Sequence, residues 1–169
     1  MCIRDRPTGV QAIAEARYGT ADAALEYLKM LQNSFGYALP GSMYEVSPDF
    51  GMIVQAWNIY ALAVPVTTEF FGIYPKAFDQ QVFFQPDMPS AWESAKLEGI
   101  RVGDNVISIN YRQTEGEITY VVEQSQPEWT IVFERSGAGR ISLNGEMLGP
   151  EEGYLLQLQG QKNTITIKQ

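Results

Sequence analysis

Hydrophobic residues recur with a helical period in the first part of the chain. Between residues 20 and 34, Leu25, Leu28 and Leu31 lie three residues apart, which indicates one apolar face of an amphipathic helix. Thr20 stands immediately before this run and is a favourable N-cap residue. A shorter run that begins after Thr8 has the same spacing. The pattern therefore predicts two helices before residue 36.

Residues 51–71 are apolar on nearly every side of a helix, and their number is close to the ~20 residues that a transmembrane helix needs. Gln55, Asn58 and Glu69 interrupt the run, and no basic residues flank it. We therefore predict no membrane span, but a helix buried in a protein core. Pro65 lacks a backbone N–H and is predicted to kink this helix or loosen one turn.

From residue 79 onward, the apolar positions alternate with polar ones, which is typical of half-buried strands. Asn144-Gly145 is a strong signal for a two-residue hairpin turn. Short strands separated by turns at this spacing favour an antiparallel β-sandwich. The residues expected on its inner face are Ile107, Ile109, Tyr111, Ile118, Tyr120, Val122, Trp129, Ile131 and Phe133.

These patterns predict an α+β chain in two parts, with helices over residues 7–78 and a β-sandwich over 79–169. Residues 1–6, "MCIRDR", carry three charges and the lone cysteine, Cys2, and join neither pattern. They resemble an adapter-derived leader and are interpreted as non-native. The helical part alone offers few partners for an all-apolar third helix, so we expect that further N-terminal sequence completes it.

Composition excludes several function classes. The net charge is −8 and no Lys/Arg cluster occurs, which argues against a nucleic-acid partner. The absence of histidine excludes Ser-His-Asp triads and the HExxH zinc motif, so acid–base chemistry falls to carboxylates, Tyr, Lys or Arg. We predict no cofactor and no metal: Asp104, Glu151 and Glu152 are interpreted as solvated turn charges, not as a calcium site.

The segment "LPGSMYEVSPDFGMIVQAWNIY", residues 39–60, places one carboxylate, Glu45, in an apolar loop before the third helix. An apolar setting disfavours an ionised carboxylate and raises its pKa unless a neighbour compensates. Glu45 is thus either a structural carboxylate that caps backbone N–H groups or a chemically active one. Asp49, four residues on, is favoured as an N-cap or turn residue of the helix, and substrate binding is its alternative role.

The stretches "EARYGTADAALEYL", "PGSMYEVSPDFGMIVQAWNIYALAVPVTTEFFGIYP" and "VFFQPDMPSAWESAKLEGIRVGDNVISINY" carry a family likeness. They resemble the C-terminal end of (α/α)6-barrel glycosidases, either glycogen-debranching (amylo-α-1,6-glucosidase-like) enzymes or α-L-rhamnosidases. The likeness covers residues 10–112 and lies in the order of the motifs. It implies that residues 7–78 are the C-terminal helical hairpins of a truncated (α/α)6 barrel.

The resemblance also implies inverting hydrolysis of an oligosaccharide or polysaccharide. One carboxylic acid protonates the leaving oxygen, and the other acts as a base on a water at the opposite face of the sugar, with the two groups roughly 6.5–9.5 Å apart. The residue that corresponds to the base is Glu45. The acid corresponds to no residue of this chain, because in the resembled enzymes it lies earlier in the barrel.

Four further residues are candidates for contact with the sugar. Tyr44 and Trp57 could stack on a pyranose ring or belong to the core, and core is favoured for Trp57. Gln55, a polar residue on a buried helix, needs a hydrogen-bond partner, which is a backbone group or a sugar hydroxyl. Asp49 is the fourth.

Three functional hypotheses follow from the sequence: a glycosidase fragment that holds the base, a non-catalytic carbohydrate-binding sandwich with a helical prefix, and a structural domain without a ligand. Carbohydrate-binding sandwiches use exposed aromatic residues on one sheet face. Tyr111, Tyr120, Trp129 and Phe133 instead fall on the face expected to be the core, which counts against the second hypothesis.

Overall fold

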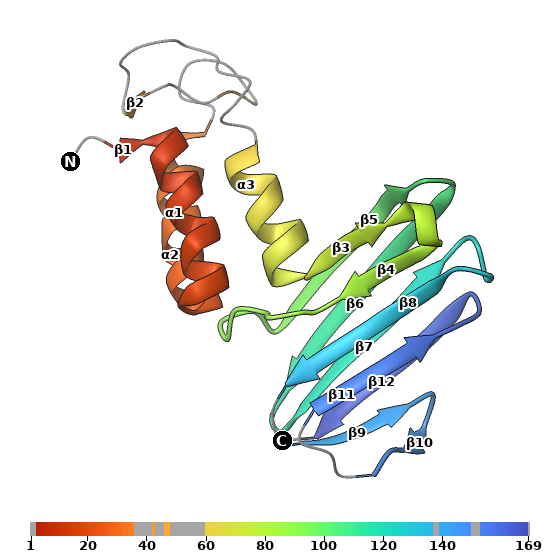
Figure 1. The fold of residues 1–169 in the computed structure, drawn as a ribbon. Helices are drawn as coiled ribbons and strands as arrows, with labels where there is room; N and C mark the ends of the chain where they lie inside the picture. The colour runs from red at the N-terminus through yellow and green to blue at the C-terminus, as the bar shows by residue number, and fades with distance from the viewer. Residues whose placement is uncertain are drawn as a thin grey trace. The chain divides into compact units, whose positions relative to one another are not determined.

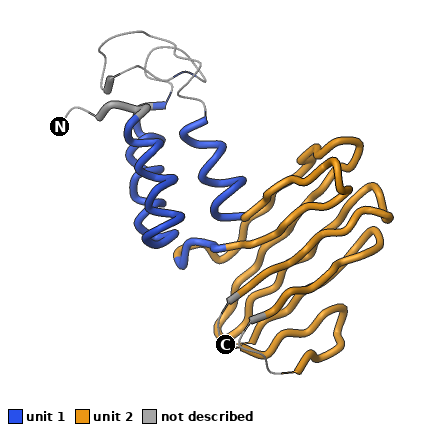
Figure 2. Tube along the Cα trace, viewed as in Figure 1, with its two compact units in different colours: residues 1–71, 87–90 blue, residues 72–86, 91–169 orange. Residues whose placement is uncertain are grey.

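The computed structural model describes residues 3–35, 42, 46–47, 60–136, 139–149 and 153–168. The chain forms two compact units (Figure 2): residues 1–71 with 87–90, and residues 72–86 with 91–169. Most of the regular structure is strand, and the helices are few and short (Figure 1).

The first unit contains α1 (Asp5–Tyr18), α2 (Ala21–Ser34), α3 (Tyr60–Val64) and the two-residue strands β1 (Ile3–Arg4) and β2 (Val46–Ser47), which pair antiparallel. Thr20 caps α2 as predicted, since its hydroxyl accepts a hydrogen bond from Ala23 N at 3.1 Å. The leucine stripe of α2 is buried. Gly9 allows close approach of α1 to α3, because a Cβ there would lie 2.3 Å from Ala61 Cβ.

The predicted helical hairpins of an (α/α)6 barrel are not found in the part of the chain that the structure describes, and this part of the fold prediction is wrong. The chain is mostly β, and its described helices span 14, 14 and 5 residues. The apolar run that suggested a long barrel helix stops being α-helical at Pro65, and residues 51–59 lie outside the described part.

Beyond Pro65 the backbone continues as a π-helix, η2 (Pro65–Phe70), which is the loosened turn expected there. Proline cannot donate to the carbonyl four residues earlier, and the wider turn is closed by Phe71 N donating to Val66 O at 2.9 Å. The hydroxyls of Thr67 and Thr68 donate to the carbonyls of Ala63 and Val64. These bonds satisfy carbonyls that a regular helix would pair with N–H groups.

The second unit is a β-sandwich of two sheets (Figure 1). The larger sheet has the strand order β10-β9-β12-β7-β6-β5, and the smaller has β11-β8-β4-β3. A 3-10 turn, η3 (Ala77–Asp79), joins β3 to β4. The strands are β3 (Ile73–Lys76), β4 (Gln81–Phe84), β5 (Ser94–Val102), β6 (Asn105–Thr114), β7 (Glu117–Gln124), β8 (Thr130–Ser136), β9 (Arg140–Leu143), β10 (Glu146–Met147), β11 (Gly153–Leu158) and β12 (Lys162–Lys168).

One pair departs from the predicted antiparallel sandwich: β4 runs parallel to β8. A parallel pair cannot be joined by a short hairpin, and here β5, β6 and β7 lie between the two strands in the chain. The other pairs within the two sheets are antiparallel, and the Asn144-Gly145 turn joins β9 to β10 as predicted, with φ angles of 52° and 88°.

The sandwich core lies between the two sheets and is rich in aromatic residues. Phe84 of β4 packs edge-on against Tyr120 of β7 with ring centroids 5.4 Å apart, and Phe133 of β8 lies 5.6 Å from Phe84. All nine residues predicted for the inner face are at most 7% exposed. The alternation along the strands therefore identified the core correctly.

Candidate functional site

The site predicted from the sequence lies outside the described residues. This holds for Glu45, the predicted base, and for Tyr44, Asp49, Gln55 and Trp57. Their roles stay predictions. Asp104 is exposed in the turn between β5 and β6, while Glu151 and Glu152 are also outside the described part. Among the residues that are described, no group of three acidic or Cys side chains is placed to hold a metal ion.

A buried carboxylate does occur in the first unit, at Glu69 in η2. Its side chain is 3% exposed and forms an ion pair with Arg17 of α1, whose Nε donates to both carboxylate oxygens at 3.0 and 3.1 Å. The Thr68 hydroxyl donates to the same carboxylate at 2.9 Å. These bonds tie α1 to the π-helix, so the geometry is that of a structural pair.

The segment 87–90 is attached to the first unit by a similar arrangement. The Asp22 carboxylate accepts hydrogen bonds from Ser90 N at 2.7 Å and from Ser90 Oγ at 2.8 Å. Asp22 lies in the first turn of α2, where a carboxylate is also favoured by the helix dipole. Both oxygens of Asp22 are thus engaged in holding the Pro-rich connection between β4 and β5.

A hollow of about 390 Å³ opens on the larger sheet of the second unit. Arg112 and Asn110 of β6 lie on one side of it, and Glu117 and Thr119 of β7 lie on the other; Thr114, Val121 and Tyr111 complete the lining. Arg112 lies directly opposite Thr119 in the β6–β7 ladder, and Thr119 lies opposite Thr166 of β12. The residues that line the hollow therefore include an arginine, an asparagine, two threonines and a glutamate.

Sequence reasoning missed this hollow, although a signal for it was present. The alternation that placed Ile109, Tyr111 and Ile118 in the core also sends Asn110, Arg112 and Thr119 to the opposite face. What the alternation could not supply is the register, which brings Arg112 and Thr119 together.

Tyr111 connects this region to the core. Its ring lies 5.4 Å from the Tyr120 ring, and its hydroxyl donates to Gln113 Oε1 at 2.5 Å. Burial raises the pKa of the Tyr111 hydroxyl above its ordinary value, and the positive charge of Arg135 opposes part of this shift. The neutral phenol is therefore the form that the folded state prefers.

We expect this preference to weaken the fold at alkaline pH. A raised pKa in the folded state means that the stabilisation is complete below pH ~10 and is lost as pH rises through the higher folded-state value. Urea unfolding at pH 8 and at about pH 11 gives the loss of unfolding free energy between the two pH values. This loss should be smaller for Tyr111→Phe than for the parent. Tyr18→Phe, at an 88% exposed position, is the control and should leave the loss unchanged. Equal losses in parent and Tyr111→Phe would contradict the interpretation.

The β3–β4 hairpin carries three aromatic residues outside the buried core. Tyr74 and Phe83 are partly exposed and lie opposite each other in the ladder, and Phe78 in the turn between them is 85% exposed. The Lys76 ammonium lies 4.7 Å from the centroid of the Phe83 ring. These three side chains are more exposed to solvent than Tyr111, Tyr120, Trp129 and Phe133, which are buried as predicted.

Comparison with known proteins adds no assignment to these observations. No protein-family model matches the chain, and a search of curated proteins finds no match either. Within the described part of the chain, no helix is both long and apolar enough to cross a membrane.

Proposed function

We propose that this chain is part of a carbohydrate-active glycosidase that hydrolyses glycosidic bonds by an inverting, two-carboxylate mechanism. The observation that carries the proposal is the motif order over residues 10–112, in which Glu45 stands alone in an apolar loop before a helix and a β-sandwich. The sandwich that follows α3 is consistent with that order. The proposal does not depend on the barrel architecture, which is not found among the described residues.

In the proposed mechanism, Glu45 takes a proton from the water that attacks the sugar, while a second carboxylic acid outside residues 1–169 protonates the leaving oxygen. The apolar neighbours of Glu45 in the sequence would raise the pKa of its carboxyl group toward the range useful for a base. The test is the kinetic effect of Glu45→Gln, which removes the proton acceptor but keeps the size of the side chain.

A second candidate function is non-catalytic carbohydrate binding by the sandwich, and the β3–β4 hairpin favours it. Aromatic rings outside a core can stack on the apolar face of a sugar, and Phe78 is exposed enough to do so. Tyr74 and Phe83 flank the same hairpin.

For this second candidate we expect Phe78→Ala to weaken binding of neutral oligosaccharides about five- to fifteenfold, since a stacked aromatic contributes ~1–1.5 kcal/mol. Isothermal titration of the 169-residue chain with neutral oligosaccharides measures this. Tyr18→Ala removes an equally exposed aromatic from α1 and is the matched control. Unchanged affinity in Phe78→Ala would exclude the hairpin as the binding surface.

A further inference from the structure

The outward face of the larger sheet carries a large share of the positively charged residues of this chain. The net charge of the chain is −8, yet half of its 12 Lys and Arg residues occupy outward positions on this sheet. They are Lys96, Arg101, Arg112, Arg140, Lys162 and Lys168. An acidic protein that concentrates its positive charge on one face attracts anions there.

Ion pairing leaves part of this positive charge uncompensated. Lys96 pairs with Glu98 at 2.5 Å, and Lys162 pairs with Glu123 at 2.9 Å. Among the described residues, no ion pair involves the other four: Arg101, Arg112, Arg140 and Lys168. Of these four, Arg112 lines the hollow.

The register places hydroxyls beside this guanidinium in one straight row. Ser94 lies opposite Arg112 on one side and Thr119 on the other, and Thr166 and Ser142 continue the row across β12 and β9. A planar guanidinium binds carboxylate bidentately, and hydroxyls can donate to or accept from neighbouring groups. No aromatic side chain points outward from the described strands of this sheet, so recognition there depends on hydrogen bonds and charge.

Glu117 narrows the class of ligand. Glu117 lines the same hollow as Arg112. A carboxylate beside the hollow would repel a doubly charged phosphate, but it can accept hydrogen bonds from sugar hydroxyls. A ligand with one negative charge and several hydroxyls can place its charge beside Arg112 and its hydroxyls beside Glu117. The volume of about 390 Å³ suits a small ligand or a short section of a chain.

We propose that the hollow on the β6–β7 face binds an acidic sugar, a uronate unit whose carboxylate meets Arg112 and whose hydroxyls meet Thr119, Asn110 and Glu117. This inference rests on the proposed carbohydrate function and adds that the sugar carries a carboxylate. The binding surface differs from both the Glu45 loop and the β3–β4 hairpin, so each can be tested separately.

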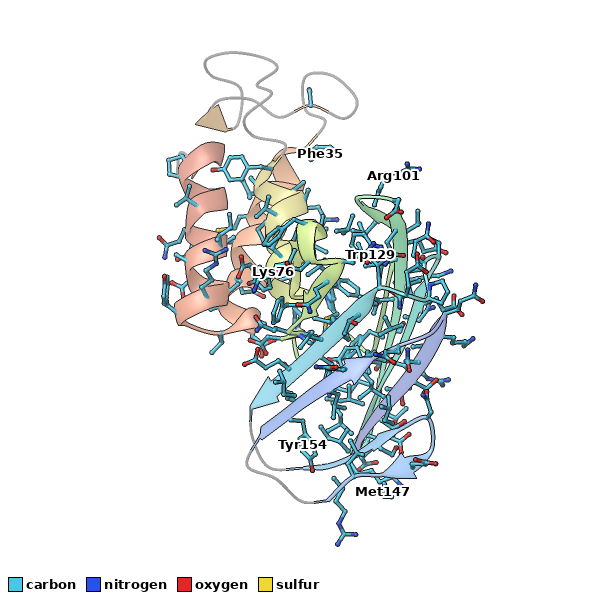
Figure 3. The ribbon with its side chains drawn as sticks, turned by 45° about the vertical axis from the view of Figure 1, so that its right-hand side comes forward. Phe35, Lys76, Arg101, Trp129, Met147 and Tyr154 are labelled. Carbon is cyan, nitrogen blue, oxygen red and sulfur yellow. The ribbon has the colours of Figure 1, made fainter. Side chains whose placement is uncertain are left out.

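The test is isothermal titration of the 169-residue chain at low ionic strength with a galacturonic acid trisaccharide and the matching neutral galactose trisaccharide. The acidic trisaccharide should bind more tightly, and Arg112→Gln should weaken its binding by about tenfold or more, because a charge-assisted bidentate contact is lost. Arg101→Gln makes the same charge change on the same face, outside the hollow (Arg101 is labelled in Figure 3), and should change affinity by about twofold or less.

Two further variants keep the test decisive if Arg112→Gln unfolds. Arg112→Lys retains the charge but not the bidentate geometry, and Thr119→Val removes one hydroxyl; each should weaken binding of the acidic trisaccharide. Inorganic phosphate should compete poorly. The proposal is overturned by equal affinity for the two trisaccharides, by equal effects of Arg112→Gln and Arg101→Gln, by tighter binding of phosphate, or by no binding of the acidic trisaccharide. None of these outcomes bears on the turnover of a Glu45 variant.

Discussion

Glu45→Gln should reduce turnover by a factor of about 10²–10⁴ in the active enzyme, with both carboxylic groups present, while sugar affinity stays nearly unchanged. The amide has the size of the carboxylate and keeps part of its hydrogen bonding, but it cannot take a proton from water. The change should therefore appear in kcat, since an interaction made only in the transition state is lost. Steady-state kinetics on a natural substrate and on an activated aryl glycoside measures it.

Azide provides the control for this experiment. A small anionic nucleophile needs no base, so azide should restore part of the activity of Glu45→Gln and none of the activity of a variant that lacks the acid. Near-normal turnover of Glu45→Gln would remove Glu45 as the base. The loop would then be structural, and the glycosidase proposal would lose the residue on which it depends.

Phe84→Ala should lower the unfolding free energy by about 3–5 kcal/mol, the usual cost of removing a buried aromatic ring. Phe84 is fully buried, and it contacts Tyr120 of the opposite sheet and Phe133 of the neighbouring strand. Its removal leaves a cavity between the sheets and removes both ring contacts. Urea denaturation followed by circular dichroism measures the loss.

The adjacent residue supplies a matched control. Phe83 has the same side chain on the same strand but points to the opposite face, where it is partly exposed and faces the Lys76 ammonium. Phe83→Ala should cost about 1 kcal/mol, which is the scale of an exposed cation–π contact with modest burial. Similar losses for the two variants would show that the ring cluster is not the centre of the core.

The sequence was most informative where one physical rule acts alone. Period-two alternation placed Ile107, Tyr120 and Phe133 correctly, because each strand has one face toward the opposite sheet. The Thr20 cap and the Asn144-Gly145 turn were predictable for a similar reason: their backbone requirements are local.

The sequence was least informative where the structure depends on strand pairing or on several competing effects. Strand β5 was not predicted, and a bulge between Leu97 and Ile100, with Gly99 at a φ of 69°, breaks its alternation. The barrel prediction failed because an apolar run suits a buried helix or several shorter elements equally well. Of the candidate sites, the Glu45 loop was singled out by its apolar setting and its role as base came from the resemblance, while the hollow at Arg112 needed the strand register.

A buried tyrosine illustrates how contacts between distant parts of the sequence close the sandwich. The Tyr154 hydroxyl (Tyr154 is labelled in Figure 3) donates to the carbonyl of Gly149 at 2.8 Å or of Gly139 at 3.1 Å, residues that flank the β9–β10 hairpin. The phenol on β11 thus lies within hydrogen-bonding distance of both ends of that hairpin, which contributes few other buried side chains.

The parallel β4–β8 pair has a consequence for the order of folding. Residues 81–84 find their partners at 130–133 only when the intervening chain is closed into a loop, and that closure costs conformational entropy before any contact repays it. The β5–β6–β7 meander needs only short hairpin connections and can form first, which brings β8 back beside β4. Folding speed should accordingly depend on the meander, and the smaller sheet should be the last part to assemble.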